Sequence, residues 1–147
     1  MSWQKEIDEL NNRKKLAQEL GGKEKVERQH KANRNTIRER INLFFDKESF
    51  QEFGMLSGQS TYKETGELEN FLPANSIIGH GLVNQQSIAF YGDDFTVRGG
   101  ASDASIWEKM VAAEKLANEY EIPLVRFIEG TGGGGSVKSL ENQGSTY

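Results

Sequence analysis

The chain has 147 residues, which fits one domain of ordinary size or a piece of a larger one. It contains no cysteine, which excludes disulfides, iron–sulfur clusters, thiolate zinc sites and cysteine nucleophiles. The net charge of −4 is unevenly divided: residues 1–40 hold 11 Lys and Arg against 7 Asp and Glu, whereas residues 41–147 hold 7 against 15. The basic front segment suits either a phosphate-bearing partner or an ordinary solvated helix face.

Membrane and metal signals are weak throughout the sequence. No apolar run approaches the ~18 residues that a membrane-spanning helix needs. The first 20 residues mix acidic and basic side chains, unlike a secretory or mitochondrial leader. The two histidines, His30 and His80, lie far apart in the chain, and no ligand cluster surrounds either. We therefore expect a cytoplasmic protein with no membrane contact and no metal site.

The front of the chain is predicted to be helical. Apolar residues at three- and four-residue steps predict an amphipathic helix over residues 2–20, which Gly21 and Gly22 would end. Residues 23–34 are almost entirely polar, so we expect a surface segment there.

A second helix signal follows at a capping box. The Thr36 hydroxyl can accept a backbone N–H three residues on, and Glu39 can reach back to the start. The helix that begins here is expected to bury Ile37, Ile41 and Phe44, which follow four- and three-residue spacing.

The middle of the chain switches to strand patterns. Residues 57–75 are rich in Gly, Ser, Thr, Glu and Asn, which predicts a loop or a weakly ordered excursion. Two short runs follow, at residues 76–83 and 87–91, and a three-residue polar turn separates them. This pattern predicts a β-hairpin.

The last third of the chain predicts helix, strand, glycine loop and helix. Residues 103–120 carry Ile106, Met110, Ala113, Ala117 and Tyr120 on one helix face, which we expect to pack on the sheet. Residues 122–128 read as a buried strand, residues 130–135 as a glycine-rich turn, and residues 136–142 as the start of another helix. The order from residue 76 is that of a β-β-α unit running into the next unit, and the chain looks cut rather than complete.

The strongest chemical signal is the glycine loop between a strand and a helix. Glycine lets the backbone approach a ligand closely, and N–H groups at a helix start lack intrahelical partners. Such a junction can hold a phosphate or a developing oxyanion. The segment Ser136-Val137-Lys138 after the glycines differs from the Gly-Lys-Ser/Thr of a Walker loop. The strand before the glycines does not open a β-α-β unit with an acidic residue ~20 positions further on, as a dinucleotide-binding fingerprint requires. The alternative is a flexible loop that binds nothing.

A second glycine junction links the predicted hairpin to the predicted helix. It begins with Asp93 and Asp94 and ends in Gly99 and Gly100. The two aspartates suit a general base or a metal site. The alternative is that they shape the turn or pair with Arg98.

Several segments of this chain resemble the carboxyltransferase (beta) subunits of biotin-dependent acyl-CoA carboxylases, such as those acting on propionyl-CoA, acetyl-CoA or methylcrotonyl-CoA. The segments are Gln29-His30-Lys31, Thr36-Ile37-Arg38-Glu39-Arg40-Ile41, Leu43-Phe44-Phe45-Asp46, Ser49-Phe50, Gly79-His80-Gly81 and Asp93-Asp94-Phe95-Thr96-Val97-Arg98-Gly99-Gly100. They occur in the family's order, and the resemblance covers roughly residues 24–138.

The resemblance implies an α/β fold of the crotonase-like type, built of β-β-α units. Residues 1–50 would form an N-terminal helical segment, and residues 51–147 the first part of the acyl-CoA-binding domain. The implied activity is transfer of a carboxyl group from carboxybiotin to the α-carbon of an acyl-CoA.

The resemblance also implies site residues. The backbone N–H groups of Gly132 and Gly133 would form an oxyanion hole, although this chain has Glu129–Gly135 where the family usually has D-S-G-G-A-R. The implied CoA-binding residues are Arg28, Lys31, Arg34, Phe95, Gly99 and Gly100. At Asn33-Arg34 the family often has Gly-Lys, so the positive charge is kept but the flexibility is not.

The implied cofactor is biotin, carried on a separate domain or subunit, and no metal serves this half-reaction. The implied partners are an acyl-CoA, the biotin carboxyl carrier, the biotin carboxylase subunit and further copies in a hexamer. Two alternatives stay open: an acyl-CoA decarboxylase subunit that runs the transfer in reverse, and a non-catalytic CoA- or nucleotide-binding module. A nucleic-acid binder rests only on residues 1–40, where interleaved aromatics are missing between residues 4 and 43. The sequence does not identify the acyl group.

Overall fold

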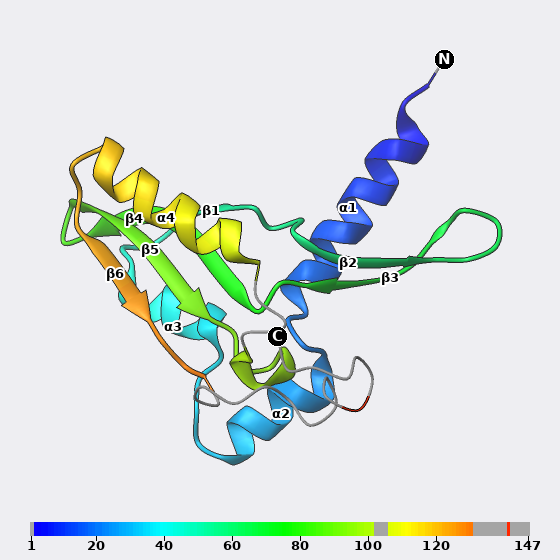
Figure 1. Cartoon of the computed structure of the whole chain (residues 1–147), viewed down its shortest axis with the longest axis horizontal. Coiled ribbons are helices and arrows are strands. Elements are labelled where there is room, and N and C mark those ends of the chain that lie inside the picture. Colours follow the sequence, from blue (N-terminus) through cyan, green and yellow to red (C-terminus); the bar gives the residue numbers. More distant parts are fainter. Residues whose placement is uncertain (1, 102–105, 131–140, 142–147) are drawn as a thin grey trace.

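A computed structural model describes residues 2–101, 106–130 and 141 of the chain (Figure 1). The first part of the described chain is helical, and the rest consists mainly of strands. In chain order the elements are α1 (Gln4–Gln18), α2 (Lys23–Lys31), α3 (Ile37–Phe44), β1 (Gln51–Phe53), β2 (Gly58–Tyr62), β3 (Leu68–Pro73), β4 (Ser76–Val83), β5 (Gln86–Asp93), the 3₁₀ turn η1 (Arg98–Gly100), α4 (Trp107–Glu119) and β6 (Leu124–Phe127).

A four-stranded sheet in the order β1-β4-β5-β6 forms the centre of the fold. The neighbours β1 and β4, and β4 and β5, are antiparallel, whereas β5 and β6 are parallel. A parallel pair needs a crossover connection, which α4 supplies. The predicted hairpin and the predicted strand–strand–helix–strand order are therefore confirmed over the described residues. The predicted start of the helix at residue 103 lies outside them.

The helix α4 packs on one face of the sheet. The β4–β5 register pairs Ile78 with Tyr91, and these two residues form a buried cluster with Ala113 of α4. Met110 and Leu124 are partly buried against this cluster. This part of the predicted helix face is confirmed. Tyr120 does not belong to the packed face: it caps the helix end and is 69% exposed.

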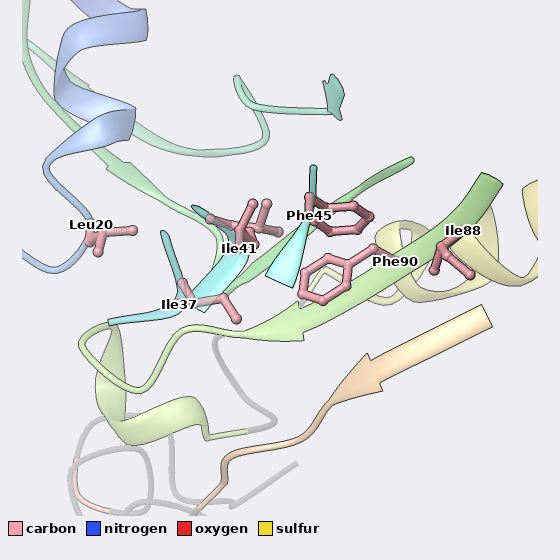
Figure 2. Close-up of a cluster of buried hydrophobic side chains, with 7 residues drawn as sticks. Leu20, Ile37, Ile41, Phe45, Ile88 and Phe90 are labelled. Atoms are coloured by element: carbon pink, nitrogen blue, oxygen red, sulfur yellow. The ribbon is translucent and has the colours of Figure 1, made fainter. Parts of the chain in front are cut away.

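The opposite face of the sheet carries α3 and the larger core. Ile37 and Ile41 of α3 pack with Phe90 of β5, and Phe45 lies across them with its ring centroid 5.4 Å from that of Phe90 (Figure 2). Phe44 is only partly buried, since Phe45 takes the inward position that spacing gave to Phe44. Burying such side chains contributes on the order of 2 kcal/mol each, so this cluster fixes α3 on the sheet.

Two segments differ from the sequence-based expectation. Within residues 57–75, β2 and β3 form an antiparallel hairpin that lies beside α1, away from the main sheet (Figure 1). β2 is mostly exposed, β3 is mostly half-buried with Phe71 buried, and both strands lack the apolar alternation that identifies strands. Residues 23–34 contain the helix α2, which has little apolar surface and buries only Gln29.

The capping box at the start of α3 is present as predicted. The Thr36 hydroxyl accepts the Glu39 backbone N–H at 3.3 Å, and the Glu39 carboxylate accepts the Thr36 N–H at 2.7 Å. The backbone of Thr36, together with His30, lowers the pKa of Glu39. Thr36→Ala should lower the free energy of unfolding by about 1 kcal/mol, because an orphan N–H loses its acceptor. Chemical denaturation checks this value, and Thr61→Ala, on an exposed strand position, serves as the control. Equal losses in the two variants would contradict the capping role.

Candidate functional site

A cavity of about 270 Å³ lies between α2 and the loop that follows β5. The helix contributes Lys25, Arg28 and Gln29 to its lining. The loop contributes Phe95, Thr96, Arg98 and Gly99. Three of these seven residues are cationic, and we refer to this space as the basic cavity. It contains Arg28, Phe95 and Gly99, three of the residues that the sequence predicted for CoA binding.

A side-chain carboxylate fixes the loop on one side of the basic cavity. Asp94 Oδ1 accepts the Thr96 backbone N–H at 2.9 Å and the Thr96 hydroxyl at 2.6 Å, which closes a tight turn. Asp94 is 1% exposed, and this burial raises its pKa. Its bonds are those of a turn-forming residue, so the turn-shaping alternative for the two aspartates has structural support. Asp93 accepts the Tyr91 hydroxyl at 2.8 Å and the Glu129 N–H at 3.0 Å.

A close backbone contact holds the α1–α2 junction against this loop. The Gly21 N–H donates to the Thr96 hydroxyl at 2.8 Å. A Cβ atom at Gly21 would lie 2.0 Å from the Thr96 carbonyl oxygen, a distance at which the backbones must separate. Only glycine therefore lets the junction before α2 lie this close to Thr96, which lines the basic cavity.

The glycine turn η1 contacts the segment that follows β6. Gly99 and Gly100 have φ of 64° and 68°, in the left-handed region that glycine adopts without strain. A Cβ atom at Gly100 would lie 2.2 Å from the Glu129 carbonyl oxygen, so the segment after β6 packs directly on the turn. The carboxyl ends of the parallel strands β5 and β6 thus meet at η1 (Figure 1). In open α/β sheets this edge is where ligands bind.

The remaining predicted CoA-binding cations lie elsewhere. Arg34 Nη1 lies 3.7 Å from Glu129 Oε1, and Arg40 Nη1 lies 2.9 Å from the other oxygen of the same carboxylate. Lys31 ends α2 with an exposed side chain and is not part of the lining of the basic cavity. Arg38 pairs with Glu52 at 2.8 Å and so ties α3 to β1.

Four lining residues of the basic cavity were not predicted from the sequence: Lys25, Gln29, Thr96 and Arg98. The signal for Lys25 was present, because it stands three positions before Arg28 and residues at this spacing share a helix face. Gly132 and Gly133, the predicted oxyanion-hole residues, lie outside the described residues.

A buried lysine lies near the Arg38–Glu52 pair. Lys109 of α4 is 5% exposed, and its ammonium group donates to the Ser76 carbonyl oxygen. Burial lowers the pKa of Lys109 to about 8, although the nearby Glu52 carboxylate favours the charged form. Burying the charged form of Lys109 lowers the free energy of unfolding, and the size of this loss depends on pH.

The described residues contain no helix that is long and apolar enough to cross a membrane. Over the same residues, no three His, Cys, Asp or Glu side chains gather as metal ligands. His30 instead lies 3.0 Å from the Glu39 carboxylate, and the His80 ring packs 5.4 Å from the ring of Phe53.

Comparison with known proteins gives one consistent result. Residues 28–146 match the family model of the carboxyl transferase domain. The chain is 32% identical over 133 residues to the carboxyltransferase subunit of propionyl-CoA carboxylase from Haloferax mediterranei, covering 90% of this chain and 26% of that protein. It is 30% identical over 122 residues to the alpha subunit of methylmalonyl-CoA decarboxylase from Propionigenium modestum, covering 82% of this chain and 23% of that protein.

A solved structure agrees with these sequence matches. The crystal structure of transcarboxylase 12S, a hexamer with methylmalonyl-CoA bound, superposes on this chain with a TM-score of 0.73 at 25% identity, over 89% of this chain and 26% of that one. The chain thus spans about a quarter of the length of the curated relatives it matches. The mixed α/β architecture, the sequence motifs and the matched range agree, and the chain belongs to the carboxyl transferase domain family.

Proposed function

We propose that this chain is the acyl-CoA-holding part of a carboxyltransferase component of a biotin-dependent acyl-CoA carboxylase. In this reaction the acyl-CoA loses its α-proton, the α-carbon bonds to the carboxyl carbon as the bond from that carbon to the biotin nitrogen breaks, and this nitrogen takes up the proton. Carboxybiotin is the second substrate and arrives on a separate carrier. The crotonase-like fold of the family, with its β-β-α units, is the framework in which we place the chain.

The basic cavity is the observation that carries this proposal. CoA bears a 3′-phosphate and a diphosphate, and Lys25, Arg28 and Arg98 place three cations around the cavity. Guanidinium groups bind phosphates with paired hydrogen bonds, and Phe95 offers a ring for the adenine base. The position of the cavity, at the carboxyl end of β5 and beside a glycine turn, suits a phosphate ligand.

The remaining predicted residues keep their proposed roles in this scheme. Gly132 and Gly133 would offer backbone N–H groups to the thioester oxygen, where negative charge develops as the enolate forms. The biotin carboxyl carrier and biotin carboxylase subunit are the proposed partners, and a hexamer is the proposed assembly, as in the 12S relative. The reverse reaction is a second candidate, because the chain is 30% identical to a methylmalonyl-CoA decarboxylase subunit.

Charge reversal at Arg28 tests the proposed CoA site. Arg28→Glu should weaken binding of CoA and of 3′,5′-ADP by about tenfold or more, since a hydrogen bond to a charged group contributes on the order of 1.5 kcal/mol or more. Isothermal titration calorimetry of the 147-residue chain measures both affinities.

Lys47→Glu is the matched control, because it makes the same charge change at an exposed position that does not line the basic cavity. Its affinities should stay near those of the unmodified chain. Equal weakening in both variants would show a general charge effect and would contradict a phosphate site at Arg28.

A further inference from the structure

A cavity of about 380 Å³ lies at the C-terminal end of α4 and shares no lining residue with the basic cavity. Half of its lining residues carry a ring, and we refer to it as the aromatic cavity. The lining residues come from β1, β4, β5 and the end of α4: Phe53, His80, Ser87, Leu116, Tyr120 and Ile122. Its volume falls within the roughly 300–1,000 Å³ that is typical of small-molecule sites.

The strand register brings the sheet residues of this lining to the face that α4 covers. Ile78 of β4 lies opposite Tyr91 of β5, and both pack against Ala113 of α4. His80 lies on the same face two residues further along β4, because the side chains of a strand alternate. Phe53 of β1 pairs with Ile78, and its ring centroid lies 5.4 Å from that of His80. The aromatic cavity therefore lies between this face of the sheet and the last turn of α4.

Three side chains of the lining have hydrogen-bonding groups that no other described residue engages. They are the His80 imidazole, the Ser87 hydroxyl and the Tyr120 hydroxyl. Each of these groups can donate and accept a hydrogen bond when the imidazole is neutral. Small-molecule sites commonly combine a mainly apolar lining with a few polar groups of this kind, which orient the ligand.

The charges around the aromatic cavity disfavour an ionic ligand. Among the described residues, none that lines the cavity carries a fixed charge. Lys115, Glu119 and Glu121 are near the end of α4 in the chain, but they are exposed and do not line the cavity. The C-terminal end of a helix carries partial negative charge, which disfavours an anion. A cation would lose its water shell without gaining a carboxylate partner.

We infer that the aromatic cavity binds an uncharged aromatic compound of one or two rings that carries hydrogen-bonding groups at its edge. Phe53, His80 and Tyr120 offer rings to such a ligand, and contacts between rings stabilise a complex beyond the burial of their area. The free groups of His80, Ser87 and Tyr120 bind its polar edge. This site is independent of the proposed CoA site, because the two cavities have no lining residue in common.

Binding of 2-naphthamide to the 147-residue chain tests the inference, because this compound has two rings, an amide edge and no charge. Proton NMR locates the binding, since the chain has 2 histidines and only His80 lines the cavity. The variant His30→Gln assigns the two sets of ring resonances. We expect 2-naphthamide to shift the resonances of His80 and to leave those of His30 unchanged.

Three matched compounds test the chemical class of the ligand. The anion 2-naphthoate and the cation 2-naphthamidinium should bind about tenfold more weakly than 2-naphthamide or worse, because each must give up its hydration without a charged partner. Decahydronaphthalene-2-carboxamide, in which the rings are saturated, should bind about threefold to tenfold more weakly, because it loses the contacts between rings.

Substitutions at exposed aromatic residues test the position of the site. Tyr120 is 69% exposed, and Tyr120→Ala should weaken binding of 2-naphthamide by about threefold or more, whereas Tyr120→Phe keeps the ring and should retain most of the affinity. Trp107→Ala is the matched control, because Trp107 is a 65% exposed ring on the same helix that does not line the aromatic cavity. Its affinity should stay unchanged, and melting temperatures verify that each variant is folded.

Three results would overturn the inference. The first is no binding of 2-naphthamide. The second is binding that leaves the His80 resonances in place or that weakens equally in Tyr120→Ala and Trp107→Ala, since the compound would then bind elsewhere. The third is equal or tighter binding of a charged or saturated compound, which would show that the ligand class is wrong.

Discussion

Replacing Gly21 by alanine is expected to lower the free energy of unfolding by about 3 kcal/mol. The added Cβ atom would lie 2.0 Å from the Thr96 carbonyl oxygen, and this contact is with backbone rather than with a flexible side-chain end. The junction before α2 must then move away from the loop, which breaks the bond from the Gly21 N–H to the Thr96 hydroxyl. Because Thr96 lines the basic cavity, the affinity for 3′,5′-ADP should fall as well.

The neighbouring residue provides the control for this prediction. Gly22 has a φ of 93°, and a Cβ atom there would meet nothing within 4 Å. Gly22→Ala therefore carries only the cost of an unfavourable backbone conformation, about 1–3 kcal/mol, and leaves the contact with Thr96 in place. Urea denaturation of both variants measures the difference, and calorimetry at a temperature where both are folded measures binding. A loss in Gly21→Ala no larger than that in Gly22→Ala would show that the backbone contact with Thr96 is unimportant.

The second large effect is expected at Lys109, as a dependence of stability on pH. Below pH 8 the lysine is charged in both the folded and the unfolded chain, and the cost of burying the charge is fully present. Between pH 8 and 10.5 the folded chain loses the proton while the unfolded chain keeps it, so stability rises with pH. The difference between the two pKa values corresponds to about 3 kcal/mol, of which about 2 kcal/mol should develop between about pH 7 and 9.5.

Lys109→Met should abolish this rise, whereas Lys115→Met, at an exposed position on the same helix, should retain it. Denaturation curves at several pH values up to about 9.5 measure the slopes. The upper limit matters because burial also raises the pKa of Tyr91, and the ionisation of this residue in the unfolded chain near pH 10 lowers stability at higher pH. If the free energy of unfolding rose equally with pH in the two variants, Lys109 would not be the source of the pH dependence.

Sequence patterns predicted the elements that bury a regular apolar face. The capping box at Thr36 and Glu39, the β4–β5 hairpin and the face of α4 around Ala113 each follow a local rule that tertiary packing then satisfies. The β2–β3 hairpin could not be predicted in this way, because Phe71 is its only buried strand residue and the hydrogen bonds that tie it to the distant helix α1 are polar contacts between side chains. Arg13 of α1 donates to the Ser60 hydroxyl at 2.9 Å and to the Tyr62 hydroxyl at 2.6 Å.

The sequence predicted which types of residue form the candidate site, but it did not predict where each of them lies. Arg28, Arg34 and Lys31 have similar charge and neighbouring positions, and nothing local distinguishes a cation beside a cavity from one that pairs with Glu129. That distinction depends on where the segment after β6 places Glu129 beside Arg34 and η1, which is a property of the folded chain. The resemblance to the carboxyltransferases supplied the proposed ligand class, and the cavity supplied the position at which we propose that it binds.

The parallel pairing of β5 and β6 has a consequence for the order in which the fold forms. The β4–β5 hairpin joins residues that are close in sequence, whereas β6 reaches β5 only after residues 94–123 close a long crossover. Closing such a loop costs chain entropy before the contacts between the two strands can stabilise it. The contact between Gly100 and Glu129 is therefore expected to form late in folding. A ligand that binds only when η1 and the segment after β6 are in contact would stabilise this late contact, so that ligand binding and completion of the sheet would become one coupled equilibrium.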